Sequence, residues 1–127
     1  MSANKILKLM NEKEVEYVDL RFTDPRGKLQ HLTMDGKMVD EQMLNEGVFF
    51  DGSSIAGWKS IHESDMILKP DLERQIIDPF TSHNTLVLFC DVIDAVKKNP
   101  YERDPRSIAK KAEAYLKKSG IGDKAYF

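Results

Sequence analysis

Residues 17–34, YVDLRFTDPRGKLQHLTM, predict the hairpin on which the rest of the fold is built. Apolar and polar side chains alternate from residue 17 to residue 23, which is the pattern of a strand with one buried side. Three apolar residues form that side: Val18, Leu20 and Phe22. The opposite side consists of Tyr17, Asp19, Arg21 and Thr23. Pro25 and Gly27 favour a turn, so residues 28–34 are predicted to return as the second strand.

Helices are predicted on both sides of this hairpin. Residues 3–11 place their apolar side chains on one stripe of a helix, and Ser2 stands at the position of an N-cap. Residues 39–46 also fit a short helix, with Gly47 placed to cap its C-terminus. Three strands are predicted after it, at residues 66–68, 75–78 and 85–92. The last has the continuous apolar sequence of a buried central strand.

This order of elements favours an α+β fold. It lacks the regular alternation of strand and helix in a doubly wound sheet. We therefore expect a β-grasp-like mixed sheet packed on a helix, with N-terminal and C-terminal helices. The C-terminal helix follows a linker at residues 97–100, with Asp104 as N-cap and Pro105 in its first position, and it ends near Gly120. Residues 125–127 look like the start of a further strand, so we expect one small domain plus the opening helix of a second.

Composition excludes several classes of protein. Lys and Arg total 19 and Asp and Glu total 21, and a net charge of −2 argues against nucleic acid or an anionic membrane as the main partner. No apolar run approaches the roughly 20 residues of a membrane span. Cys90 is the single cysteine, so no internal disulfide can form, and we expect a reduced, cytoplasmic location.

The most unusual segment runs from Gly52 to Ser64. It shows little periodicity and is long for a connection in a compact domain, which is typical of functional loops. Trp58 either folds back onto the sheet or docks into a partner, and the residues alone favour neither alternative. Asp51 and Asp65 bracket the loop, so pairing of the flanking strands would bring both carboxylates to one edge of the sheet, where they could hold a cation.

Other sequence motifs of catalytic or metal sites are weak. Three histidines lack the spacing of metal ligands: His31, His62 and His83. The small residues at 51–57 lack the Lys-Ser/Thr ending of a phosphate-binding loop.

Four stretches resemble the N-terminal signature of bacterial type I glutamine synthetase. They are FDGSS at residues 50–54, ESDMIL at 63–68, VDLRFTD at 18–24 and YERDPRS at 101–107. The resemblance covers nearly the whole chain and implies a β-grasp domain at the N-terminus of the enzyme. Under it, residues 1–15 form an N-terminal helix and residues 16–98 the β-grasp domain. Residues 99–127 form a linker and the first helix of a truncated catalytic domain.

The resemblance implies an ATP-dependent glutamate–ammonia ligase of nitrogen assimilation. Such an enzyme makes glutamine from glutamate, ammonia and ATP through γ-glutamyl phosphate, and its active sites lie between neighbouring subunits of a dodecamer. The family's ammonium-site aspartate matches Asp51, which is the expected catalytic residue. Ser54, Trp58 and Asp65 match residues of the ammonium site and subunit contact.

The resemblance also implies what residues 1–127 lack. The family's Mg²⁺ or Mn²⁺ ligands, ATP pocket and phosphate-binding arginines fall beyond Phe127. We therefore expect no metal ligands in this chain, no bound cofactor and no synthetase activity from these residues alone.

Two other hypotheses remain open at this point. The chain could be a free-standing β-grasp protein-interaction domain without catalysis. It could also be a carboxylate metal-binding module built on Asp51, Glu63 and Asp65, although three acids alone are expected to bind a divalent cation weakly.

Overall fold

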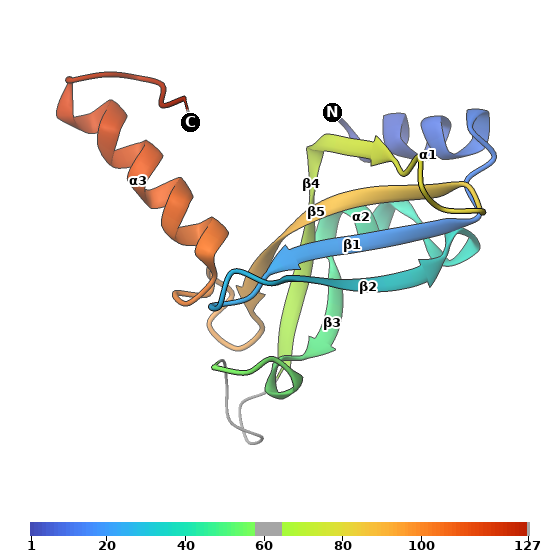
Figure 1. Ribbon diagram of the computed structural model, residues 1–127, viewed down its shortest axis with the longest axis horizontal. Coiled ribbons are helices and arrows are strands. Elements are labelled where there is room, and N and C mark those ends of the chain that lie inside the picture. The colour runs from blue at the N-terminus through green and yellow to red at the C-terminus, as the bar shows by residue number, and fades with distance from the viewer. Residues whose placement is uncertain (58–64, 127) are drawn as a thin grey trace.

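The computed structural model describes residues 1–57 and 65–126. Its α-helices are α1 (Ala3–Glu12), α2 (Glu41–Glu46) and α3 (Pro105–Ser119), with 3-10 turns at Gly36–Met38 and Gly52–Ser54. Its strands are β1 (Tyr17–Thr23), β2 (Leu29–Asp35), β3 (Val48–Asp51), β4 (Asp65–Ile77) and β5 (Thr85–Asp94). They form one curled sheet in the order β2-β1-β5-β4-β3 (Figure 1). Only β1 and β5 are parallel among these neighbours, so the sheet is mixed, as predicted.

Helices α1 and α2 cover one face of the sheet, because their buried side chains share a single core with the strands. Strand β5 lies at the centre of the sheet, as its apolar sequence predicts. Four of its side chains enter this core: Leu86, Leu88, Cys90 and Val92. The helices contribute Ile6, Met10, Met43 and Leu44 among others. Burial of a side chain of this size stabilises the fold by about 1.5–3 kcal/mol. The expected β-grasp-like fold is confirmed.

The connection from α2 to β3 depends on Gly47. This residue has a φ of 92°, and a Cβ atom built there would lie 2.4 Å from the carbonyl oxygen of Leu68. Only glycine fits such a close backbone approach, so the predicted cap is confirmed. The predicted start of α2 was two residues too early. Val39 is extended, and the helix begins after Asp40, whose carboxylate accepts a hydrogen bond from the Met43 amide.

Three local predictions need correction. The strands expected at 66–68 and 75–78 are one strand of 13 residues, β4, which shifts register between Pro70 and Gln75 and continues beside β5. Pro70 therefore does not end the strand, because it still pairs with Cys90 and the register shift lies after it. Residues 48–51 form β3, which was not among the strands predicted with bounds, although the loop after it was expected to be flanked by strands. Ser2 stands at the N-cap of α1 but makes no side-chain capping bond.

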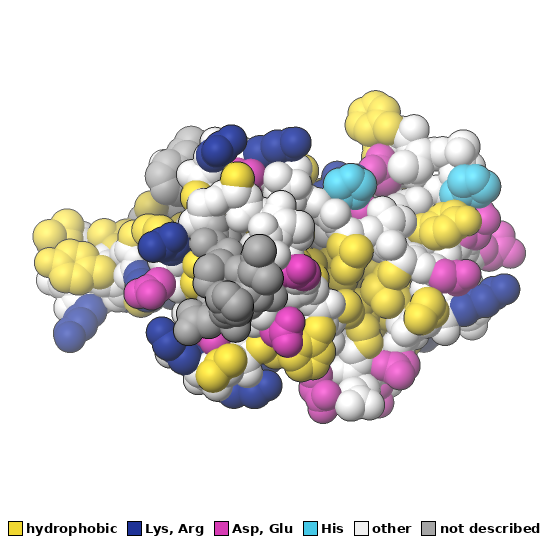
Figure 2. All heavy atoms as spheres, turned by 90° about the horizontal axis from the view of Figure 1, so that it is seen from below, with side chains coloured by type: hydrophobic (Ala, Val, Ile, Leu, Met, Phe, Trp, Pro, Cys, Tyr) yellow, Lys and Arg dark blue, Asp and Glu magenta, His cyan; other side chains and the backbone are white. Residues whose placement is uncertain are grey.

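Helix α3 extends away from the sheet (Figure 1). It begins at Pro105 after the Asp104 cap and ends at Gly120 in the left-handed conformation, as predicted. Two large apolar side chains of this helix, Ile108 and Tyr115, are 55% and 73% exposed. Hydrophobic side chains are visible at this end of the molecule, at the left of Figure 2. No helix in the described part of the chain is long and apolar enough to cross a membrane.

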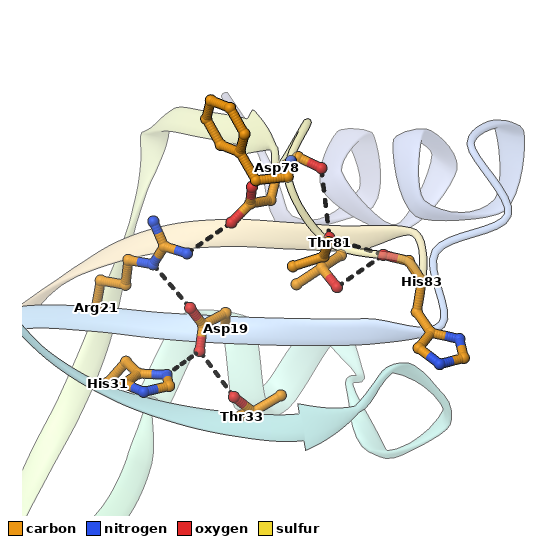
Figure 3. Close-up of polar contacts among 9 residues, drawn as sticks. Asp19, Arg21, His31, Thr33, Asp78, Thr81 and His83 are labelled. Atoms are coloured by element: carbon orange, nitrogen blue, oxygen red, sulfur yellow. Dashed lines mark hydrogen bonds and ion pairs between the residues drawn. The ribbon is translucent and has the colours of Figure 1, made fainter.

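The sheet face opposite α1 and α2 carries a cluster of polar side chains around Asp19 (Figure 3). We predicted this residue on the solvent side, but it is only 4% exposed. Its carboxylate accepts hydrogen bonds from Arg21 Nε at 2.7 Å and Thr33 Oγ1 at 2.9 Å, and His31 Nδ1 lies 2.8 Å away. Arg21 also donates to Asp78 at 2.8 Å. The neighbouring side chains therefore bury Asp19 and satisfy it.

Candidate functional site

The candidate site lies where β3 ends and β4 begins. These strands are antiparallel, and their register pairs Phe50 with Met66 and Asp51 with Asp65. Directly opposed residues project to the same face of a sheet, so the two aspartates are cross-strand neighbours. The prediction that strand pairing brings both to one edge is confirmed.

Asp51 is exposed and holds the first turn of the loop that follows it. Its Oδ1 atom accepts hydrogen bonds from the Ser53 amide at 2.9 Å and the Ser53 hydroxyl at 2.7 Å. Ser54 donates from its hydroxyl to the Asp51 carbonyl oxygen at 2.5 Å. Asp51 thus caps the turn at Gly52–Ser54 while its carboxylate stays at the surface. Such a group can attract a cation and accept a proton from it.

The loop then passes close to two other segments of the chain. Gly57 has a φ of 88°, and Pro25 of the β1–β2 turn lies near the position its Cβ would take. The Gly57 carbonyl oxygen accepts a hydrogen bond from Arg103 Nη1 at 3.0 Å. Trp58 falls outside the described residues. Sequence analysis gave Arg103 no role, although the YERDPRS stretch that contains it was part of the resemblance.

Metal ligands form no cluster within residues 1–57 and 65–126, where no three His, Cys, Asp or Glu side chains are placed to hold an ion. Asp51 and Asp65 supply two carboxylates, and Glu63, the third acid of that hypothesis, lies outside the described residues. His31 and His83 contact different acids, Asp19 and Glu16. The described donor set therefore does not fit a divalent cation.

Cys90 offers no nucleophile in its present environment. Its thiol is buried in the core, and burial raises the pKa of the thiol above its usual value. A thiol is reactive mainly as the thiolate, so Cys90 acts as a small core residue.

Comparisons with known proteins agree with this fold. The family model described as "Glutamine synthetase, beta-Grasp domain" matches residues 14–95. Glutamine synthetase of Rhizobium meliloti (strain 1021) is 60% identical over 125 residues, covering 98% of this chain and 27% of that protein. Glutamine synthetase of Escherichia coli (strain K12) is 51% identical over 127 residues, covering 100% and 27%.

A solved structure shows the same fold. Plasmodium falciparum glutamine synthetase aligns with a TM-score of 0.84 at 24% identity, covering 94% of this chain and 23% of that one. The chain spans about a quarter of the length of the curated relatives it matches. Because the family model matches more than half of the chain, this chain belongs to the glutamine synthetase family, and residues 14–95 match its β-grasp domain.

Proposed function

We propose that this chain is the N-terminal part of a glutamine synthetase and supplies the ammonium site to a neighbouring identical subunit. The whole enzyme joins glutamate and ammonia at the expense of ATP. The exposed Asp51 carboxylate, fixed at the β3–β4 edge opposite Asp65, is the observation that carries this proposal. The relatives' names support the reaction.

Asp51 has the chemistry that the ammonia step requires. Carboxylates are charged at neutral pH, so the site attracts ammonium. Asp51 then accepts a proton, and the nitrogen lone pair of the resulting ammonia attacks the carbonyl carbon of γ-glutamyl phosphate. Phosphate leaves with the electrons of the broken C–O bond, and the nitrogen loses a further proton to give the amide. Proton transfer of this kind contributes about 10²–10⁴ in rate.

Three further residues complete the proposed site. Ser54 binds the Asp51 carbonyl and fixes the turn, while Asp65 adds a second negative charge on the facing strand. Trp58, outside the described residues, is proposed to make the subunit contact. Within the chain, residues 1–15 are the N-terminal helix, 16–98 the β-grasp domain, and 99–127 the linker and first helix of the catalytic domain.

The remaining parts of the proposal concern the whole enzyme. Its Mg²⁺ or Mn²⁺ and its ATP are held by residues of the catalytic domain. Its subunits form a ring, a dodecamer in the family, in the cytoplasm.

A chimeric enzyme tests this function. Residues 1–127 replace the matching quarter of the Rhizobium meliloti enzyme, and glutamine formation is measured while ammonium is varied. The chimera is expected to be active, and Asp51→Asn is expected to lower kcat/KM for ammonium by about 10²–10⁴. Ring assembly should persist, and stability should change by less than about 1 kcal/mol, because asparagine can still cap the turn.

Two controls decide the outcome. Glu41→Gln removes an exposed carboxylate at the start of α2, at the opposite end of the α2–β3 segment from Asp51, and should leave ammonium kinetics unchanged. Residues 1–127 alone should form no glutamine above a blank. An inactive but assembled chimera rejects the function, and unchanged ammonium kinetics in Asp51→Asn rejects the role of that residue.

A further inference from the structure

Residues 101–107, YERDPRS, connect three parts of the molecule: strand β5, helix α3 and the loop that begins at Asp51. Asp104 and Pro105 of this segment start α3, but neither the sequence pattern nor the proposed reaction gives Arg103 a role. Its hydrogen bonds show which of its residues serve the fold and which one reaches the candidate site.

Both sides of Arg103 are attached to the same residue of β5. The Tyr101 amide donates to the Val92 carbonyl oxygen at 2.9 Å. The Val92 amide donates to the fully buried Asp104 carboxylate at 3.2 Å. Asp104 also caps α3 by accepting from the Arg106 amide at 3.1 Å. The backbone that carries Arg103 is therefore held against the centre of the sheet.

The first turn of α3 has a second attachment to the sheet. Arg106 Nε donates to Asp91 of β5 at 2.8 Å, and its Nη2 contacts Asp71 of β4. Lys110, one turn further along α3, also contacts Asp91. Asp104 and Arg106 thus fix α3 without any contribution from Arg103.

Arg103 instead extends toward the candidate site. Its Nη1 atom donates to the Gly57 carbonyl oxygen at 3.0 Å, although the two residues lie 46 positions apart. Gly57 follows the turn at Gly52–Ser54 that Asp51 caps. A guanidinium is always charged in proteins and forms strong hydrogen bonds. This bond connects Arg103, whose backbone is held against β5, to the loop just after its first turn.

We propose that Arg103 is a positioning residue of the candidate ammonium site. It acts through the Gly57 carbonyl and holds residues 52–57 in the arrangement that presents Asp51. The role of Arg103 toward ammonium rests on the function proposed above, whereas its hold on the loop does not. Asp51 and the segment bearing Arg103 are both fixed to the sheet. The Arg103–Gly57 bond therefore holds residues 52–57 at both ends.

Amide hydrogen exchange in the 127-residue chain tests the hold on the loop. The Ser53 and Ile55 amides donate within this segment, to Asp51 and Gly52, and report its opening. Arg103→Ala should speed their exchange roughly three- to tenfold, the size of one net hydrogen bond. Arg103→Lys, which keeps a charged donor, should recover part of the protection. Arg74→Ala, an exposed arginine on β4, is the matched control and should change neither rate.

The chimeric enzyme tests the consequence for ammonium. Arg103→Ala should raise KM for ammonium about three- to tenfold with kcat little changed, and Arg103→Lys should restore part of it. Unchanged exchange rates of the Ser53 and Ile55 amides in Arg103→Ala overturn the proposal, whatever the ammonium kinetics of Asp51→Asn. Faster exchange with unaltered ammonium KM overturns the positioning role and leaves only a structural bond. Failure of the proposed function is separate, because it is read from an inactive but assembled chimera, and failure of the Asp51 role is read from Asp51→Asn.

Discussion

Asp19 and Asp51 lie on the same face of the sheet, yet their surroundings differ. Asp19 is buried and contacts side chains from β1 and from β2 across the hairpin. Asp51 is exposed, and its carboxylate accepts hydrogen bonds from the amide and the hydroxyl of Ser53, two residues further along the chain. The fold therefore uses the Asp19 carboxylate to join two strands and presents the Asp51 carboxylate at an edge of the sheet.

The environment of Asp19 also sets its ionisation. Burial works to raise the pKa of Asp19, but hydrogen bonds from Arg21, His31 and Thr33 outweigh it and hold the pKa below its usual value. Arg21 links the same cluster to Asp78, the residue that follows β4 (Figure 3). A charge held by several partners stabilises the fold, so substitution of Asp19 should affect stability and not ammonium use.

The largest expected effect on stability is that of Asp19→Ala. It leaves Arg21, His31 and Thr33, which are themselves half-buried or exposed, without the acceptor that they share. Loss of hydrogen bonds to a charged group costs about 1.5–3 kcal/mol. Denaturant unfolding of the 127-residue chain measures it, with Asp123→Ala beyond α3 as an exposed control that should stay within about 0.5 kcal/mol. A loss of less than about 1 kcal/mol in the free energy of unfolding would contradict the structural role that distinguishes Asp19 from Asp51.

Acid pH should reduce the stability difference between the wild-type chain and a variant that lacks the Asp19 charge. The folded-state pKa of Asp19 lies below the ordinary value of 3.8, so its stabilising contribution is complete above that value and is lost as pH falls through the lower folded one. The stability gap between the wild-type chain and Asp19→Asn should therefore narrow below about pH 4. Unfolding curves at several pH values check this.

Asp104 provides a contrast of opposite sign. Burial raises the pKa of Asp104, so the contribution of Asp104 to stability grows as pH falls. Because the wild-type chain and Asp19→Asn both contain Asp104, this contribution does not change the stability gap between them. A gap between wild type and Asp19→Asn that widens at acid pH would show that Asp19 is not held as a charged group.

The predictable parts of this molecule are those whose causes are local in sequence. The β1–β2 hairpin follows from alternation and a turn, and α3 follows from Asp104 and Pro105. The pairing of Asp51 with Asp65 was also foreseeable, because the two residues end strands joined by one loop.

The unpredicted parts depend on distant partners. Asp19 is buried partly because Arg21 beside it reaches Asp78, 57 positions away. Arg103 finds Gly57 at a separation of 46. Neither contact follows from periodicity or capping, which describe neighbours along the chain. The resemblance identified the YERDPRS stretch but not what its residues bind.

The smallest expected effect concerns the site itself. Asp51 and Asp65 are directly opposed, and like charges in that position destabilise a sheet. Asp65→Asn should therefore stabilise the chain by about 0.2–0.5 kcal/mol at low ionic strength. The gain should disappear in an Asp51→Asn background, because the repulsion has already been removed, and it should shrink in salt, which screens exposed charges. A double-mutant cycle from denaturant unfolding at low and high salt measures all three effects. A gain that persists without the Asp51 charge would mean that Asp65 is unfavourable for another reason. A loss of stability would mean that the fold uses Asp65 much as it uses Asp19, so the β3–β4 edge would then be structural and not an exposed pair of acids kept at a cost for binding a cation.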